Sequence, residues 1–252
     1  MAREIIEAGG RASAIAVDVR DADSIKRMVD ETIQMHTKID VLIYNSGAIW
    51  WASVQNTPLK RFQLMQRINP EGLYATIQAL LPHFERQAWK ARIVVISPPI
   101  YSRFFRGKTA YAMGKVGMSV LTKGLAMDFQ REEKKNMCIT SLWPAAAIES
   151  AATQDMMRTD PGAARELRKA TIFSDAILGI LKADVKDVNG ELLLDEDFLR
   201  DYVGIMDFGK YALVEGAVPR RIMPVRLPDL KVAEQDDEGR RNDSLKTRSA
   251  KL

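Results

Sequence analysis

The chain has 252 residues, enough for one sizeable core, and 46% of them are hydrophobic. No apolar run approaches the roughly 20 residues of a membrane span, and the first eleven residues lack the apolar segment of a secretory signal. We therefore expect a soluble, intracellular protein. The net charge of +4 comes from basic residues that are scattered or lie near the carboxyl end without interleaved aromatics, so nucleic-acid binding is not expected. The single cysteine, Cys138, excludes an internal disulfide and a cysteine-built metal site.

Short apolar runs alternate with amphipathic stretches along the chain, which is typical of a parallel sheet covered by helices on both faces. Asp21 or Asp23 could cap the first helix of this α/β pattern, and Asn69-Pro70 should kink the second, a kink that can free the Asn69 carbonyl. Strands are predicted at 13–17, 39–44, 92–97, 137–142 and 191–194, and helices at 24–36, 59–89, 108–133 and 145–181 with a break at 159–162. Residues 233–252 are charged and polar and predict a disordered tail after a single domain spanning 1–232.

The clearest chemical signal is the pair Tyr111 and Lys115. Four residues apart on a helix, they place a phenol and an ammonium on one face, which is the arrangement of a tyrosine acid/base. Taken alone the spacing is weak, but the helix follows a buried strand that ends at Ser97. Upstream, Asn45-Ser46-Gly47 forms a turn at the carboxyl end of another strand, where open α/β sheets bind ligands.

Seven segments in order make the sequence similar to the short-chain dehydrogenase/reductase family over residues 1 to 228. They are Val17-Asp18-Val19-Arg20-Asp21, Asn45-Ser46-Gly47-Ala48, Asn69-Pro70-Glu71-Gly72, Ile96-Ser97-Pro98-Pro99, Tyr111-x-x-x-Lys115, Leu142-Trp143-Pro144 and Leu194-Asp195-Glu196. The resemblance implies a Rossmann-like doubly wound parallel sheet and an oxidoreductase that uses NADP or NAD. The expected reaction interconverts an alcohol and a carbonyl on a small, lipid-like substrate, with the methionine-containing segment 150–180 as a lid.

The same resemblance implies roles for individual residues. Tyr111 is expected to be the acid/base, with its pKa lowered by Lys115, which also holds the nicotinamide ribose. Asn69 would place a water against Lys115 through its kinked backbone, and Ser97 would orient the substrate. The expected cofactor-binding residues are Asp18, Val19, Asn45, Ser46, Gly47, Tyr111, Lys115, Pro144 and Ile148. The ordinary interpretations stay open, since asparagines also form turns and Ser97 could simply bond backbone at a strand end.

Three features depart from the family pattern. Without a gap, the family's serine position falls on Pro98 rather than Ser97, and Ala145 stands where a glycine commonly follows the proline. The third is the absence of a Thr-Gly-x-x-x-Gly-x-Gly phosphate turn, because residues 1–10 resemble the helix that comes after it. We therefore expect a domain that is N-terminally truncated by its first β-α-β unit, with an unpaired strand at the edge of its sheet.

This departure keeps other functions open. One is a catalytically impaired, truncated product that acts as a binding or dimerisation partner, and a weaker one is a lipid-binding module without redox chemistry. The last residues, Ala250, Lys251 and Leu252, resemble a peroxisomal import signal and predict an import receptor as partner, with cytoplasm or mitochondrion as alternatives to the peroxisome. From the family, we also expect a homo-oligomer formed through 72–89 and 110–129.

Overall fold

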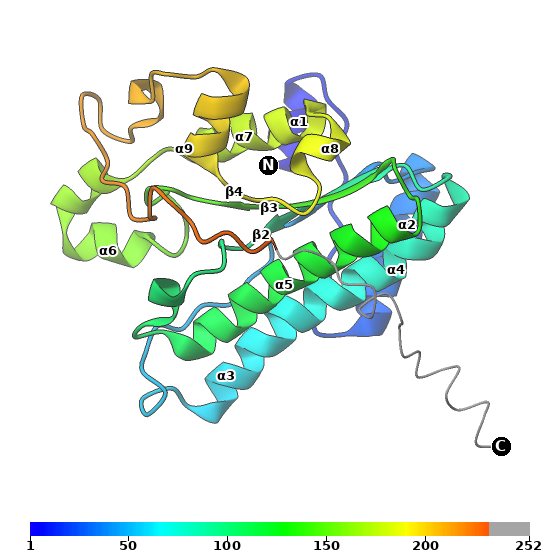
Figure 1. The fold of residues 1–252 in the computed structure, drawn as a ribbon, viewed down its shortest axis with the longest axis horizontal. Helices are drawn as coiled ribbons and strands as arrows, with labels where there is room; N and C mark the ends of the chain where they lie inside the picture. Colours follow the sequence, from blue (N-terminus) through cyan, green and yellow to red (C-terminus); the bar gives the residue numbers. More distant parts are fainter. Residues whose placement is uncertain (232–252) are drawn as a thin grey trace.

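The computed structural model describes residues 1–231, which form one parallel sheet between two layers of helices (Figure 1). Its four strands lie in the order β1-β2-β3-β4, and their bounds are β1 Val41–Tyr44, β2 Ala91–Ile96, β3 Met137–Trp143 and β4 Leu192–Leu194. The register pairs Tyr44 with Val95, Ile96 with Leu142, and Trp143 with Leu194. The carboxyl ends of the strands therefore meet along one edge of the sheet.

Helices cover both faces of the sheet, which confirms the predicted doubly wound, Rossmann-like fold (Figure 1). On one face α2, α4 and α5 bury Leu73, Phe84 and Met118 against Ile93 and Val95. On the other face Val94 and Leu142 pack against α7, α8 and α9. The α-helices are α1 Ala2–Glu7, α2 Ala22–His36, α3 Leu59–Gln66, α4 Gly72–Arg86, α5 Thr109–Arg131, α6 Gln154–Thr159, α7 Thr171–Lys182, α8 Val185–Val188 and α9 Asp195–Phe198.

Several shorter turns complete the described chain. They are 3₁₀ turns at Ser102–Phe105, Pro161–Glu166 and Gly209–Tyr211, and π-helical turns at Arg67–Glu71 and Leu199–Val203. Within the described residues, no helix is long and apolar enough to cross a membrane. The predicted tail, residues 233–252, lies outside the described residues.

Most predicted elements are found close to their expected bounds, and of the two candidates Asp21 caps α2 by accepting a hydrogen bond from the backbone of Asp23. Two predictions are wrong, one in the extent of a helix and one in the existence of a strand. Residues 145–153 are turns and isolated bridges rather than helix, because the backbone of Ala145 and Ile148 pairs with other segments. Residues 13–17 are not a strand, since within the described residues their backbone has no neighbouring strand with which to form hydrogen bonds.

The expected kink at Asn69-Pro70 takes the form of the π-helical turn Arg67–Glu71 between α3 and α4. Proline has no N–H and cannot continue the regular ladder, and a single wide turn accommodates it. The backbone N–H of Gly72 bonds the carbonyls of Arg67 and Asn69, so the prediction that the Asn69 carbonyl is freed is wrong.

The strand β1 lies at the edge of the sheet, and within the described residues it pairs with β2 alone. Its side chains Val41 and Ile43 are exposed, the latter by 45%. The predicted unpaired edge is therefore present in the described part of the chain.

Candidate active site

Tyr111 and Lys115 lie on the first two turns of α5, beside the carboxyl ends of β1 and β2. Both side chains are buried, with exposed fractions of 4% and 5%. The Lys115 Nζ donates a hydrogen bond to the carbonyl of Ile96 at 2.8 Å, and it lies 5.5 Å from the centre of the Trp143 ring. Burial lowers the pKa of Lys115 to about 8, because the charged form is poorly solvated there.

The pKa of Tyr111 is raised by burial, which is opposite to the predicted direction. The reason is geometric: the Lys115 ammonium is directed at the Ile96 carbonyl, and the phenol is surrounded by aromatic rings. The Trp51 ring meets the Tyr111 ring edge-on at 6.2 Å, and the Phe104 ring lies at 6.3 Å. In this chain alone Tyr111 is therefore a protonated phenol at neutral pH.

Asn69 is fully buried, and its side chain forms two hydrogen bonds with the backbone of Ala48. Its Oδ1 accepts from the Ala48 N–H at 2.9 Å, and its Nδ2 donates to the Ala48 carbonyl at 3.1 Å. This pair fixes the turn that follows β1 and brings Gly47 against the amine of Lys115. A Cβ on Gly47 would lie 3.3 Å from the Lys115 Nζ and 3.5 Å from the Asn69 Oδ1, so a larger residue would crowd both groups.

Ser97 points into the protein interior. Its side chain is fully buried, and its Oγ lies 3.0 Å from both Ser119 Oγ and Ser141 Oγ. Ser119 donates its hydroxyl proton to the carbonyl of Pro98 at 2.6 Å. These contacts tie the ends of β2 and β3 to α5, and the Ser97 hydroxyl does not reach an open site. The interpretation as a strand-end serine bonded within the protein fits this geometry better than a substrate-orienting role.

The other predicted cofactor residues come from three segments of the chain. Asn45, Ser46 and Gly47 follow β1, and Gly47 lies next to Lys115. Asp18 is close to the surface, and both of its carboxylate oxygens bond the Arg20 guanidinium, whose hydrogen bond and charge lower the pKa of Asp18 to about 2. Val19 is half-buried, with its carbonyl close to Gly72.

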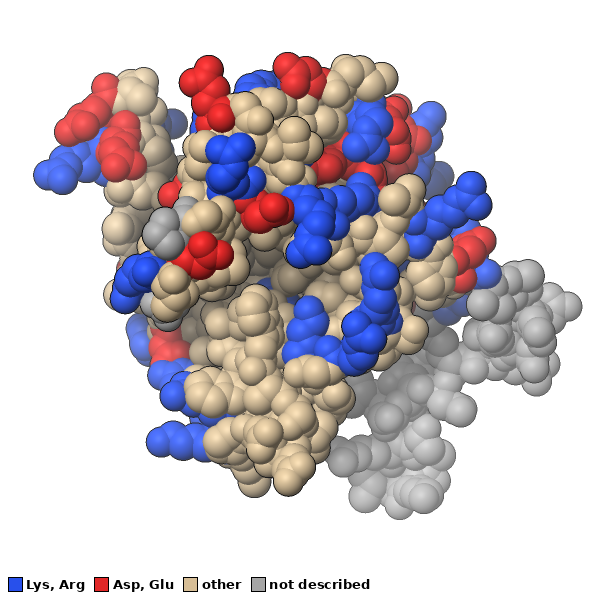
Figure 2. All heavy atoms as spheres, turned by 90° about the vertical axis from the view of Figure 1, so that its left-hand side faces the viewer, with Lys and Arg blue, Asp and Glu red and all other residues tan. Residues whose placement is uncertain are grey.

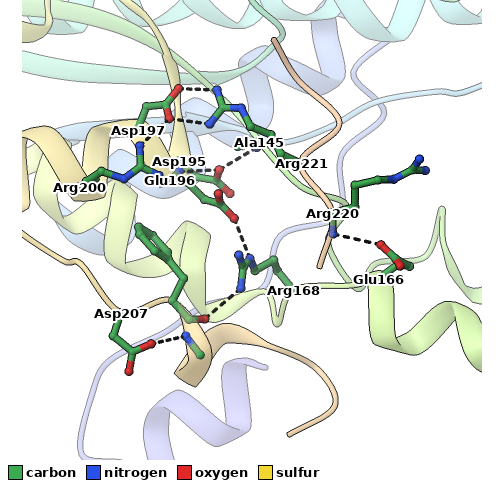
Figure 3. Close-up of polar contacts among 12 residues, drawn as sticks. Ala145, Glu166, Arg168, Asp195, Glu196, Asp197, Arg200, Asp207, Arg220 and Arg221 are labelled. Atoms are coloured by element: carbon green, nitrogen blue, oxygen red, sulfur yellow. Dashed lines mark hydrogen bonds and ion pairs between the residues drawn. The ribbon is translucent and has the colours of Figure 1, made fainter. Parts of the chain in front are cut away.

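Pro144 and Ile148 are half-buried in the segment after β3, and a buried carboxyl group holds that segment (Figure 3). The Oδ1 atom of Asp195, at the end of β4, accepts from the N–H groups of Ala145 at 2.8 Å and Glu196 at 2.7 Å. Its Oδ2 atom is buried without a hydrogen-bond partner in the described residues. Burial, set against these two hydrogen bonds, raises the pKa of Asp195 to about 7.

Three ion pairs surround Asp195, one between Arg168 and Glu196 and two that join Arg200 and Arg221 to Asp197 (Figure 3). Arg168 donates from Nε to Glu196 at 2.7 Å and from Nη1 to the Phe208 carbonyl at 3.0 Å, and both charged side chains are buried. Arg221 bonds both oxygens of Asp197, at 2.6 and 2.7 Å. The chain near residue 221 is thereby fixed to α9, and the N–H groups of residues 222 and 223 bond the carbonyl of Ala145.

Sequence reasoning missed the aromatic wall around Tyr111 and the role of Asp195 in holding Ala145. Trp51 and Phe104 come from segments without a regular hydrophobic period, so only their bulk could have marked them. Asp195 belongs to one of the seven family-like segments, but its burial depends on packing between β3, β4 and the segment near residue 223.

Comparison with known proteins assigns this arrangement to a family. The short chain dehydrogenase family matches residues 1–157. The chain belongs to the short chain dehydrogenase family, and the predicted family is confirmed.

Among curated relatives, the chain is similar to hydroxysteroid dehydrogenase-like protein 2. It is 36% identical to the Rattus norvegicus protein over 217 residues, which are 85% of this chain and 40% of that protein. The Homo sapiens protein is 35% identical over 217 residues, covering 85% of this chain and 50% of that protein. The chain thus spans about two-fifths to one half of the length of these relatives.

Solved structures give the same assignment. A putative dehydrogenase from Xanthomonas campestris is 33% identical with a TM-score of 0.76, covering 92% of this chain and 81% of that one. A short chain dehydrogenase from Mycobacterium thermoresistibile is 33% identical with a TM-score of 0.78, covering 90% and 79%. These relationships place the protein in an oxidoreductase family, and that family implies a nicotinamide cofactor, NAD or NADP.

The residues around Lys115 fit the ribose end of such a cofactor. The ammonium has three donors, and the Ile96 carbonyl takes one of them. Beside this ammonium, Gly47 leaves room that a side chain would fill. Within the described residues, no glycine-rich turn joins a strand to a helix in the way that a pyrophosphate cradle requires.

Proposed function

We propose that the protein is an NAD(P)-dependent oxidoreductase that interconverts an alcohol and a carbonyl on a lipid-like substrate, with Tyr111 as the acid/base. The observation that carries this proposal is the buried pair of Tyr111 and Lys115 at the carboxyl edge of β1 and β2. In open α/β sheets this edge is where ligands bind.

Lys115, Asn45, Ser46 and Gly47 would hold the nicotinamide ribose side of the cofactor. The two remaining donors of Lys115 suit ribose hydroxyl oxygens, and Asn69 keeps Gly47 in place through its two bonds to Ala48. Pro144 and Ile148 would border the nicotinamide, on a segment that Asp195 fixes through Ala145. When bound, a nicotinamide supplies or accepts the hydride.

Tyr111 handles the proton of the same reaction. In the reduction direction its Oη–H bond breaks and the proton passes to the carbonyl oxygen of the substrate, which leaves Tyr111 as a phenolate. The raised pKa keeps the phenol protonated before the step, as a proton donor requires. In the oxidation direction the phenolate must form first.

The surroundings of the phenol support an apolar substrate. Rings of Trp51 and Phe104 lie against Tyr111, and Phe104 in turn meets the Trp143 ring edge-on at 5.9 Å. Figure 2 shows one face of the molecule, and its lower end is largely uncharged (tan). Figure 1 places α3 and the loop leading to it at that end. That loop exposes Trp51 and Val54, which is the surface a lipid-like molecule would cover.

The test is a Tyr111→Phe variant assayed with NADH and NADPH against a panel of ketones and alcohols. The exchange removes one oxygen from a ring that stays packed, so folding and cofactor affinity should be unchanged while turnover falls about 100- to 10,000-fold. Tyr74→Phe, on an exposed ring of α4, is the matched control and should keep full turnover. Undiminished turnover by Tyr111→Phe would refute the assignment.

Titration of the chain with NADH and NADPH tests the competing function, a catalytically impaired binding partner. Micromolar binding of either nucleotide, followed by fluorescence of the reduced nicotinamide, supports the oxidoreductase. Binding of neither by a folded chain would refute the proposal for this chain.

We also propose that a second copy of the chain covers the outer face of α4 and α5, where Tyr74, Val120 and Met127 are exposed. Exposed apolar side chains gathered on two neighbouring helices are typical of an interface. The mass in solution, measured by light scattering, should be a multiple of 28.3 kDa. A monomer at micromolar concentration would contradict this proposal.

The carboxyl-terminal Ala250, Lys251 and Leu252 support a proposal of peroxisomal delivery by an import receptor. A fluorescent protein fused before residue 1 should collect in peroxisomes, and deletion of these three residues should disperse it. A diffuse or mitochondrial signal from the intact fusion would contradict the proposal.

A further inference from the structure

Lys108 lies directly before the helix that carries Tyr111, and among the described residues it has no anionic partner. Its side chain is half-buried, and burial lowers its pKa. Its Nζ lies 4.1 Å from the centre of the Phe104 ring and 5.8 Å from that of Trp51. Within the described residues these rings are the contacts of the ammonium, and burial is the one influence on its pKa.

The ring contacts do not satisfy the ammonium. Cation–π attraction offsets part of the loss of water, but the three N–H donors still lack oxygen acceptors in the described part of the chain. The half-buried ammonium has lost part of its water, and an opposite charge that reached it would replace what is lost. An anion at Lys108 would therefore be bound by a charge-assisted hydrogen bond, which is stronger than a neutral one.

The same two rings connect Lys108 to the proposed acid/base. Trp51 and Phe104 each contact the Tyr111 ring, at 6.2 and 6.3 Å, so the ammonium and the phenol share one aromatic wall. Trp51 is 62% exposed, which leaves this wall open to an arriving molecule. A ligand that reached both groups would have an apolar body against the rings and an anionic group at Lys108.

We propose that Lys108 is the residue that selects a substrate with a carboxylate, attached to an apolar body whose carbonyl or alcohol is presented to Tyr111. The inference rests on the proposed function and narrows its substrate class from lipid-like molecules to lipid-like acids. A carboxylate suits the site because a single ammonium matches a single charge. Trp51 and Phe104 provide the apolar surface for the chain that carries it.

The experiment compares medium-chain oxo acids with their methyl esters as substrates of the wild type, Lys108→Met and Lys108→Arg. Methionine keeps an unbranched stem on the rings and removes the charge, whereas arginine keeps the charge. For the acids, Lys108→Met should lower kcat/KM about 10- to 100-fold through KM, and Lys108→Arg should recover most of the loss. For the esters all three proteins should be equal. Arg106→Met, two residues earlier and exposed, is the matched control and should preserve the preference for acids.

If Lys108→Met lowered kcat/KM equally for acids and esters, the inference would be overturned. Tighter binding of an alkyl phosphate than of the carboxylic acid with the same chain length would also overturn it. The quenching of tryptophan fluorescence by the acid gives a readout that needs no turnover. Tighter acid binding by the wild type than by Lys108→Met, without turnover of any substrate, would support the carboxylate site while refuting the proposed function. Turnover of esters that depends on Tyr111 but not on Lys108, together with no preference for acids, would support the proposed function while refuting the carboxylate site.

Discussion

Replacement of Asp195 by asparagine should make the stability of the protein less dependent on pH. The carboxyl group is fully buried, one oxygen has no hydrogen-bond partner in the described residues, and its pKa is raised to about 7. The charged groups that act on it are Glu196, which raises the pKa, and Arg168, which lowers it. Because the folded state holds this proton more tightly than the unfolded chain, the group stabilises the fold at low pH. That stability is lost as the pH rises through about 7.

The size of the effect follows from the two pKa values. A rise from 3.8 to about 7 corresponds to about 4 kcal/mol in total, at about 1.4 kcal/mol for each pKa unit. Between pH 5 and pH 8 the part that is lost is about 2.5 kcal/mol. The amide that Asp195→Asn introduces does not titrate, while its oxygen can still accept from the N–H groups of Ala145 and Glu196.

Urea unfolding of both proteins at pH 5, 6, 7 and 8 measures this difference. Relative to the wild type, Asp195→Asn should become more stable by about 2.5 kcal/mol between pH 5 and pH 8. Any fixed penalty of the amide cancels in this comparison. Asp197→Asn is the matched control: burial raises the pKa of Asp197, but Arg221 and Arg200 outweigh it and lower that pKa overall, so this carboxyl is ionised in the folded and the unfolded chain from pH 5 to pH 8 and the stability difference from the wild type should stay constant. A difference between Asp195→Asn and the wild type that stays constant over this range would show that the carboxyl group is not protonated in the fold.

Two further substitutions test the frame of the site. Asn69→Ala leaves the N–H and carbonyl of Ala48 without their side-chain partners. The free energy of unfolding should fall by about 1–3 kcal/mol, and the affinity for NADH and NADPH should fall with it. Unchanged nucleotide affinity would show that Asn69 does not support the cofactor site. Arg168→Met leaves the buried carboxylate of Glu196 unpaired and should lower the free energy of unfolding in urea by about 3–5 kcal/mol. The double variant Arg168→Met/Glu196→Leu should recover much of that loss. A double variant no more stable than the single one would show that the unpaired charge of Glu196 does not cause the loss of stability.

The sequence was sufficient to predict the fold, because the alternation of apolar runs is local, and it marked the pair Tyr111 and Lys115 through their spacing together with the family-like segments around them. Alternating apolar runs define β1 to β4, and a spacing of four residues on a helix does not depend on distant contacts. The segment 13–17 has the composition of a strand, but a strand exists only when a neighbour accepts its hydrogen bonds.

Side-chain direction was the part that the sequence could not predict. Ser97 comes at the expected strand end, yet its hydroxyl turns inward because Ser119 and Ser141, from α5 and β3, provide partners there. Nothing in the sequence marks Lys108, since a lysine before a helix is ordinary. Its position against Trp51 and Phe104 depends on two loops that are distant from each other in the chain.

The direction of the Tyr111 pKa bears on which half of the reaction the chain itself favours. Burial keeps the phenol protonated, and the Lys115 ammonium is held by the Ile96 carbonyl rather than by the phenol. Under the proposed function, reduction of a carbonyl would begin from the chain as it stands, because the phenol already carries its proton. Oxidation of an alcohol needs the phenolate, and a further positive charge must enter the site to lower the Tyr111 pKa toward neutrality. An oxidised nicotinamide would supply such a charge and a reduced one would not, so in the proposed reaction the positive charge of the bound cofactor would rise as Tyr111 loses its proton, and the two changes would offset each other.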